Sequence, residues 1–414
     1  MTYLHSLLKR HGPGWLLMAA SLGFFVVMIQ LARAQTLTTL YSFTGGSDGF
    51  GPAGKLLMDN AGNLYGTTEF GGTGSCQGPN GLTGCGTVFK ITPSGVETVL
   101  YRFTGGADGA EPIGGLVFDG QGNLYGTTYT GGIVNSDCLT GCGVVFEVSP
   151  SGSEDVLYSF KGGTDAAYPS GDLTFDAQGD LLGTTFNILG GGGPDSYYSV
   201  FKVTTEGVET VLYSFSGGAD GGAPRAGLLL DKQGNIYGAA YYGGAYANGV
   251  LFEITASGAE KTLFSFPGGS HGSFPNGGLI RDAKGNLYGT TEYGGAGLAG
   301  DHTGCGVLFE LTSKGAEKVL WRFPAGKKSN PCEPTAGLAI DATGNFYGTT
   351  YFGSGESRDW GTLFERPIIG KPKMLAGLNG HPEATVILDN QGNLYGTTFD
   401  GGDFGYGMVF KFAP

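Results

Sequence analysis

Two glutamates and several aromatic residues occupy one position of an internal repeat, directly after a Gly-Thr-Thr or Gly-Ala-Ala triplet. They are Glu69, Tyr129, Tyr241, Glu292 and Tyr351. Irregular segments of the repeat add three more candidate residues, His302, Arg358 and Trp360. Sugar rings stack on aromatic faces and sugar hydroxyls bond to carboxylates, so this set predicts a saccharide-binding surface. The alternative is that the recurring aromatic side chains pack between neighbouring repeats.

Carboxylates are also the residues that cleave glycosidic bonds, when two of them lie about 5–9 Å apart. The candidates for such a pair are Glu69, Glu292, Glu356 and Asp359. Nucleophilic catalysis is less well supported, because no histidine stands in a local motif such as G-x-S-x-G. The sequence contains no Walker loop, H-E-x-x-H helix or Rossmann fingerprint. We therefore assign no catalytic residue and do not expect an enzyme, with a polysaccharide-cleaving hydrolase or lyase as the alternative.

Aspartates recur two residues after a Gly-Gly pair, where a calcium site could be considered. They are Asp48, Asp108, Asp165 and Asp220. A calcium ion takes six to eight converging oxygens, whereas a single aspartate in each repeat suits hydrogen bonds within a turn. We expect no cofactor, with calcium as the alternative. The formal net charge is −13 and the 23 basic residues are scattered, which argues against a nucleic-acid partner.

The six cysteines form an even set. They are Cys76, Cys85, Cys138, Cys142, Cys305 and Cys332. Four converging ligands are needed for zinc, but these cysteines lie in different repeats. We expect three disulfides that join Cys76 to Cys85, Cys138 to Cys142 and Cys305 to Cys332, in loops of one face. Such bonds stabilise long loops and are typical of proteins outside the cytoplasm.

The N-terminal segment has the pattern of an export signal. Basic residues precede an apolar run from Trp15 to Leu31, and Ala32-Arg33-Ala34 supplies small residues before a cleavage point. We predict a signal peptide over residues 1–34 and one domain over residues 35–414. An uncleaved anchor is the alternative. After cleavage we expect no membrane association, a secreted, periplasmic or cell-surface location, and a monomer.

One motif, Asp-x-x-Gly-(Asn/Asp)-x-(Tyr/Leu)-Gly, occurs seven times, beginning at Asp59, Asp119, Asp176, Asp231, Asp282, Asp341 and Asp389. The intervals of about 48 to 60 residues are close to those of propeller blades. In the first unit, strands are expected at Gly54–Met58, Leu64–Thr68, Thr87–Thr92 and Glu97–Phe103, with tight turns between them. Gly66, inside the second strand, is expected to let a neighbouring backbone approach closely. Glycine is abundant, with 82 residues, and long helical periodicity is absent.

The two ends of the repeat array complement each other. Leu37–Phe43 resembles a fourth strand without a blade of its own, and the seventh unit stops after its third strand, Met408–Phe412. If the first strand completes the last blade, the chain forms a ring with no broken blade. The sequence therefore predicts an all-β, seven-bladed β-propeller of four-stranded blades. A β-solenoid is the alternative.

The recurring elements LYSFTGG, GNLYGTT and G-x-(V/L)-F, as at Leu40–Gly46, Gly62–Thr68 and Gly86–Phe89, resemble the Gloeo/Verruco tandem repeat of exported bacterial proteins. The resemblance covers roughly Leu37 to Phe412. It implies a surface or extracellular setting and no established activity, so no functional residues follow from it. Members of the family often carry a C-terminal sorting anchor; this sequence ends at Pro414 without an apolar or basic tail, which favours free secretion or a periplasmic location.

The functional prediction is a binding propeller for an extracellular glycan or protein. The longer, variable loops, between the second and third strands and between blades, emerge on one face of a propeller, and function is expected there. A purely structural surface protein is a further alternative and would have no pocket deeper than the open channel.

Overall fold

The computed structural model describes residues 35–186, 198–295, 304–325, 327, 330–355 and 360–414. Residues Leu37–Phe412 form one compact unit. Apart from strands, the regular elements among the described residues are three short 3-10 turns, η1 (Pro79–Gly81), η2 (Gly163–Asp165) and η3 (Gly269–His271). No helix in these ranges is long and apolar enough to cross a bilayer. The predicted signal peptide, residues 1–34, lies outside the described residues.

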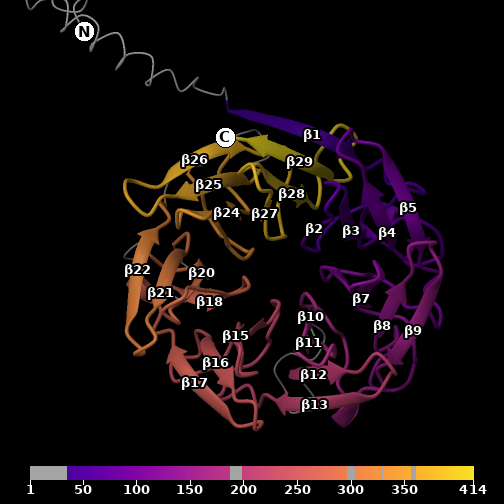
Figure 1. Ribbon diagram of the computed structural model, residues 1–414, viewed down its shortest axis with the longest axis horizontal. Helices are drawn as coiled ribbons and strands as arrows, with labels where there is room; N and C mark the ends of the chain where they lie inside the picture. Colours follow the sequence, from indigo (N-terminus) through magenta and orange to yellow (C-terminus); the bar gives the residue numbers. More distant parts are fainter. Residues whose placement is uncertain (1–34, 187–197, 296–303, 326, 328–329, 356–359) are drawn as a thin grey trace, which may run out of the picture. The chain divides into compact units, whose positions relative to one another are not determined.

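Seven antiparallel sheets follow one another around a ring (Figure 1), so the fold is the predicted seven-bladed β-propeller. Blade 1 consists of β2 (Leu57–Met58), β3 (Leu64–Thr68), β4 (Thr87–Ile91) and β5 (Glu97–Arg102). Blade 2 consists of β6 (Val117–Phe118), β7 (Leu124–Thr128), β8 (Val144–Val148) and β9 (Glu154–Ser159). Blade 3 consists of β10 (Thr174–Phe175), β11 (Leu181–Thr185), β12 (Ser199–Val203) and β13 (Glu209–Ser214). Blade 4 consists of β14 (Leu229–Leu230), β15 (Ile236–Ala240), β16 (Val250–Ile254) and β17 (Glu260–Ser265). Blade 5 consists of β18 (Ser273–Pro275), β19 (Ile280–Arg281), β20 (Leu287–Tyr293), β21 (Val307–Leu311) and β22 (Glu317–Arg322). Blade 6 consists of β23 (Ala339–Ile340), β24 (Phe346–Thr350), β25 (Thr362–Arg366) and β26 (Lys373–Gly377). Blade 7 consists of β27 (Ile387–Leu388), β28 (Leu394–Thr398), β29 (Met408–Ala413) and β1 (Thr36–Ser42).

The N-terminal strand closes the ring as predicted. β1 is the outermost strand of blade 7 and pairs with β29 (Figure 1). Just beyond β1, the N–H of Phe43 donates to the carbonyl of Gly407 at 3.0 Å. The ring of Phe43 is fully buried and lies 5.1 Å from that of Phe89 in blade 1. The first strand therefore joins the last blade to the first through both hydrogen bonds and apolar packing.

The repeated aspartate fixes the turn between the first two strands of each blade. The carboxylate of Asp59 accepts hydrogen bonds from the N–H groups of Ala61 and Asn63, the Asn63 side chain and the Tyr65 hydroxyl. Burial of Asp59 works to raise its pKa, but the hydrogen bonds from Asn63 and Tyr65 outweigh it and the pKa is lowered. The aspartate thus acts as a turn-forming residue.

The glycine of the Gly-Thr-Thr triplet makes room for an aromatic ring. Gly66 pairs with Phe89 across the two central strands, and a Cβ atom on Gly66 would lie 2.6 Å from Phe89 Cζ. The expectation that a neighbouring backbone approaches Gly66 was wrong, because the space is taken by this fully buried phenylalanine side chain. The same pair recurs in the second blade as Gly126 and Phe146.

The innermost strands are shorter than predicted. In blade 1 only Leu57 and Met58 pair with β3, whereas the sequence predicted a strand from Gly54. A Cβ atom on Gly54 would lie 2.5 Å from the carbonyl oxygen of Gly114 in blade 2. The inner segments of adjacent blades converge on the ring axis, so this stretch lies against the neighbouring blade rather than in its own sheet.

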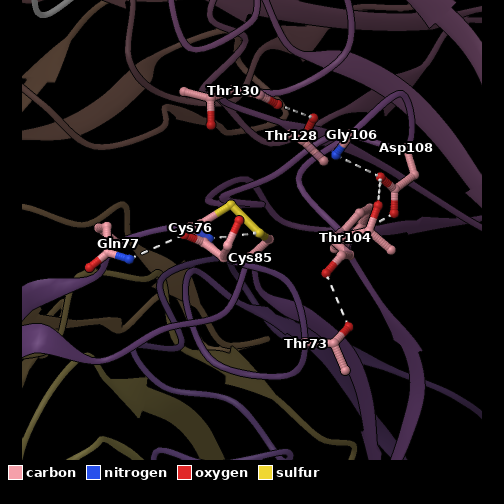
Figure 2. The surroundings of a disulfide bond; sticks show 11 residues. Thr73, Cys76, Gln77, Cys85, Thr104, Gly106, Asp108, Thr128 and Thr130 are labelled. Carbon is pink, nitrogen blue, oxygen red and sulfur yellow. Dashed lines mark hydrogen bonds between the residues drawn. A yellow bond between two sulfur atoms is a disulfide. The ribbon is translucent and has the colours of Figure 1, made fainter.

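The three disulfides join the predicted pairs Cys76–Cys85, Cys138–Cys142 and Cys305–Cys332. Figure 2 shows the first, beside the turn that carries Thr104 and Asp108 between blades 1 and 2. A Cβ atom on Gly105 in that turn would lie 2.7 Å from Cys76 Sγ and 2.6 Å from Cys85 Sγ. The disulfide therefore holds a loop of blade 1 against the connection that leads to blade 2.

Candidate functional site

A cavity of about 470 Å³ lies at the centre of the ring, and every blade contributes to it. Each interblade connection contains a proline, and the residue after it lines the cavity. These residues are Ala53, Ile113, Ser170, Arg225, Asn276, Thr335 and Glu383. Because interblade connections emerge on the same face as the loops between second and third strands, the cavity opens on the face where function was expected.

A backbone hydrogen bond sets the triplet position beside this proline position. In blade 1 the N–H of Glu69 donates to the carbonyl of Gly51, directly before Pro52, at 3.0 Å. In blade 6 the N–H of Tyr351 donates to the carbonyl of Glu333 in the same way, at 2.8 Å. The two repeat positions therefore alternate around the mouth of the cavity.

The cavity continues through the ring. Two positions after the proline-following residue, six of the seven blades carry a residue that lines both this cavity and a second one of about 270 Å³: Lys55, Asp172, Gly227, Gly278, Gly337 and Thr385. In blade 2 the residue at this position, Gly115, lines only the second cavity. Asp172 is held in place by the N–H of Gly115 at 2.7 Å. The glycines at this position have no side chains to fill this part of the channel, where Lys55 is the basic residue and Asp172 the acidic one.

Acids gather on one side of the cavity. Burial, together with the nearby charges of Glu383 and Glu111, raises the pKa of Glu69 to about 8. Burial and Asp400 raise the pKa of Glu383 to about 7, against the opposing effect of His381. Glu383 is open to channel water although protein surrounds it, and that water moderates the effect of burial. At neutral pH this side of the cavity holds protonated carboxyl groups that can donate as well as accept hydrogen bonds.

The opposite side carries Glu292 in a defined hydrogen-bonding position. Its Oε2 accepts from the Tyr241 hydroxyl at 3.0 Å and from Asn276 Nδ2 at 3.2 Å. Burial and the neighbouring Glu292 raise the pKa of Glu333 to about 7. The Tyr241 ring also lies under the Arg225 guanidinium, 4.3 Å from its centroid. This side therefore combines an oriented carboxylate, an amide and a cation.

The structure separates the predicted binding residues into several groups. Glu69, Glu292 and Tyr351 line the cavity. Tyr241 lies behind Glu292, and Tyr129 packs against Tyr168 of the next blade with ring centroids 5.3 Å apart.

Three further predicted residues do not meet at the cavity in the described structure. Trp360 lies in the loop between β24 and β25, where its carbonyl accepts from the N–H of Ser354, and it does not line the cavity. His302 and Arg358 lie outside the described residues.

Sequence reasoning missed much of the cavity lining. Lys55, Arg225 and Asn276 were not among the predicted residues, although two of them directly follow an interblade proline. The signal that could have found them is variation at this fixed position: each repeat keeps the proline and changes the next residue. Variable side chains on a regular backbone are typical of a binding surface.

The recurrent interblade aspartates have local hydrogen-bonding roles. Asp48 accepts from the N–H of Thr44 at 2.7 Å, from its hydroxyl at 2.6 Å and from the Tyr41 hydroxyl at 3.0 Å. Within the described ranges, His, Cys, Asp and Glu side chains form no group of three or more that could hold a metal ion.

Comparisons with known proteins place the chain among repeat proteins. The model of the Gloeobacter/Verrucomicrobia repeat matches residues 25–193 and 140–333. No curated protein matches. Among solved structures, the extracellular domain of a candidate hybrid two-component system from B. thetaiotaomicron is 13% identical, with a TM-score of 0.55. The match covers 91% of this chain and 39% of that one.

A second structure from B. thetaiotaomicron, the extracellular domain of a candidate one-component system, is 11% identical with a TM-score of 0.53. The match covers 92% of this chain and 42% of that one, so this chain spans about two fifths of the length of these two B. thetaiotaomicron proteins. At such identities these similarities concern the fold alone.

Proposed function

This chain belongs to the Gloeobacter/Verrucomicrobia repeat family, and we propose that it is an exported binding protein whose central cavity takes a saccharide. The three disulfides support an oxidising location outside the cytoplasm. The family match identifies the repeat and assigns no activity, so the proposal rests on the cavity itself.

The observation that carries the proposal is the mixture of groups at one repeat position. Ser170, Asn276, Thr335 and Glu383 bring neutral or titratable polar side chains to the lining of one space of about 470 Å³. A saccharide presents many hydroxyls that both donate and accept hydrogen bonds, and hydroxyls, amides and carboxyl groups satisfy them. Tyr351, on the cavity wall, is stacked on His381 with ring centroids 4.3 Å apart, which fixes an aromatic surface beside these polar groups.

Replacing Asn276 with alanine tests the cavity as the binding site. The substitution removes an amide that orients Glu292 and faces the cavity, and one lost hydrogen bond of this kind weakens binding by about tenfold. The wild-type protein is first screened on an array of extracellular polysaccharides and oligosaccharides. The affinity of the best glycan is then measured by calorimetry for both proteins.

Gln178→Ala is the matched control, because Gln178 is an exposed residue of the turn on the opposite face. It should leave the affinity unchanged. If binding survives Asn276→Ala but is lost in Gln178→Ala, the binding site lies on the face opposite to the cavity mouth. The absence of binding to every glycan would refute the saccharide proposal.

A polysaccharide-cleaving activity is the second candidate, because Glu69 has the character of a general acid. Its raised pKa of about 8 keeps it protonated at neutral pH beside Glu383 and Glu111. If Glu69 acts as the acid on glycosidic bonds, the wild-type protein should release oligosaccharides from a bound polysaccharide. Glu69→Gln should then reduce the rate of this release by about 100-fold or more. If the protein binds the polysaccharide but releases no product during a long incubation, the cleaving activity is excluded and the binding function is retained.

A further inference from the structure

Arg225 lines the cavity and is held by aromatic side chains of two blades. Its guanidinium lies between two aromatic rings, 4.1 Å from the centroid of Phe186 in blade 3 and 4.3 Å from that of Tyr241 in blade 4. Aromatic rings attract the cation through their faces. The guanidinium thus lies over two aromatic rings, its N–H groups along the planar edge remain as hydrogen-bond donors, and Arg225 lines the cavity.

The protein leaves this cation without a counter-charge in the described structure. Arg225 forms no ion pair with any described residue, and its Nε, shielded from solvent, has no hydrogen-bond acceptor among them. Glu292 forms no ion pair with Arg225, and its Oε2 accepts instead from the Tyr241 hydroxyl and Asn276. A guanidinium edge that is oriented but not compensated matches a planar anion that binds through two oxygens.

An aromatic cluster adjoins Tyr241, the ring over which the cation lies. The Tyr242 ring stands at 87° to that of Tyr241, with centroids 4.7 Å apart, and its side chain is 41% exposed. Phe274 packs against both tyrosines, with centroids 5.1 Å and 5.9 Å away. Tyr242 is therefore held in place by its neighbours while open to a ligand, as a surface on which a sugar ring can stack.

We infer that the saccharide is acidic and that Arg225 binds the carboxylate of a hexuronic acid residue. This inference rests on the proposed function and names its ligand class. A uronic acid has three features that fit this region: a planar carboxylate for the Arg225 edge, hydroxyls for Asn276 and Glu292 in the cavity, and a ring face for Tyr242, which packs on Tyr241 outside the cavity lining.

The acids of the cavity do not oppose such a ligand at neutral pH as strongly as their number suggests. Burial and neighbouring acids keep Glu69 protonated and Glu383 about half protonated. Lys55 lines the same cavity and forms no ion pair with any described residue. The two cations therefore face the channel with much of the opposing negative charge removed.

The test compares matched ligands that differ only in the carboxylate. Oligogalacturonate, oligoglucuronate and oligomannuronate are each measured by calorimetry beside their carboxyl-reduced, neutral counterparts, together with a sulfated neutral oligosaccharide. At least one uronate should bind the full-length protein about tenfold or more tightly than its reduced form, since a charge-assisted pair is lost in the latter. Arg225→Gln should remove this preference, so that the affinity for the uronate falls about tenfold or more while the affinity for the reduced form falls by less. Arg225→Lys keeps the charge between the rings but loses the planar fork, so it should retain only part of the preference.

The outcomes separate the ligand class from the proposed function. Equal binding of uronate and reduced forms, or binding only of neutral glycans, overturns the acidic ligand while the saccharide function stands. A preference for the sulfated glycan over every uronate overturns the assignment of a carboxylate. A uronate preference that survives Arg225→Gln in a variant with unchanged melting temperature overturns the role of Arg225. If no glycan of any kind binds, the proposed function itself fails.

Discussion

Glu69, a single side chain in the channel, makes the stability of the fold depend on pH. Its pKa rises from 4.5 to about 8 because protein surrounds it and because Glu383 and Glu111 lie nearby. Below the ordinary value, both the folded and unfolded states are protonated and Glu69 has no effect on the pH dependence of folding. As the pH rises from 4.5 to 8, the unfolded state ionises first, so the free energy of unfolding decreases; above 8 the full loss is present.

Glu69→Gln should therefore stabilise the protein at high pH only. We expect no difference from the wild type at pH 4 and a gain on the order of 1–2 kcal/mol at pH 9, since channel water screens part of the charge. Urea unfolding at the two pH values measures this. Glu206→Gln, at an exposed turn, is the control and should show no such gain. An equal effect of Glu69→Gln at both pH values would contradict the raised pKa.

In each blade one glycine pairs with one phenylalanine across the two central strands. In blade 2 the Phe146 ring lies over Gly126, and a Cβ atom there would stand 2.4 Å from Phe146 Cζ. The same phenylalanine contacts Phe103 of the preceding interblade connection, with ring centroids 5.0 Å apart. One glycine thus admits the side chain that joins adjacent blades.

Gly126→Ala should lower the free energy of unfolding by about 1–3 kcal/mol, because the new methyl group forces Phe146 out of its position. Gly120→Ala in the same blade is the control: a Cβ atom there has no heavy atom within 4 Å, and the change should stay within about 0.5 kcal/mol. Chemical denaturation of the wild type and both variants measures these changes in the free energy of unfolding. Equal stabilities would mean that the Gly126 site relaxes without cost.

The whole ring depends on a contact between residues far apart in the sequence. Phe43 follows β1, which completes blade 7, and packs on Phe89 of blade 1. Phe266 has the equivalent place between blades 4 and 5, also fully buried, with its ring centroid 5.2 Å from that of Phe309. The closing contact is thus built like an internal one.

If closure is as tight as the interior of the ring, Phe43→Ala and Phe266→Ala should each cost about 3–5 kcal/mol, the usual loss for a buried phenylalanine. Thermal and urea unfolding of both variants provide the comparison. A Phe43→Ala variant as stable as the wild type, beside a destabilised Phe266→Ala, would show that the terminal strand is not firmly docked.

The sequence by itself determined the number of blades, the order of their strands, the closing strand and the disulfide pairs. These features are either local or enforced by repetition: a turn motif marks each blade, and a spare strand has one vacancy to fill. Part of the candidate site was accessible for the same reason, since Glu69, Glu292 and Tyr351 occupy one repeat position that lines the cavity.

Which side chains meet around the cavity follows from the tertiary structure alone. The Arg225 guanidinium lies over Phe186 from blade 3 and Tyr241 from blade 4. Glu292, which accepts a hydrogen bond from the Tyr241 hydroxyl, comes from blade 5. No spacing in the sequence fixes these distances. They follow from the angle between neighbouring blades and from the convergence of the inner segments on one axis, which exists only once the ring has closed.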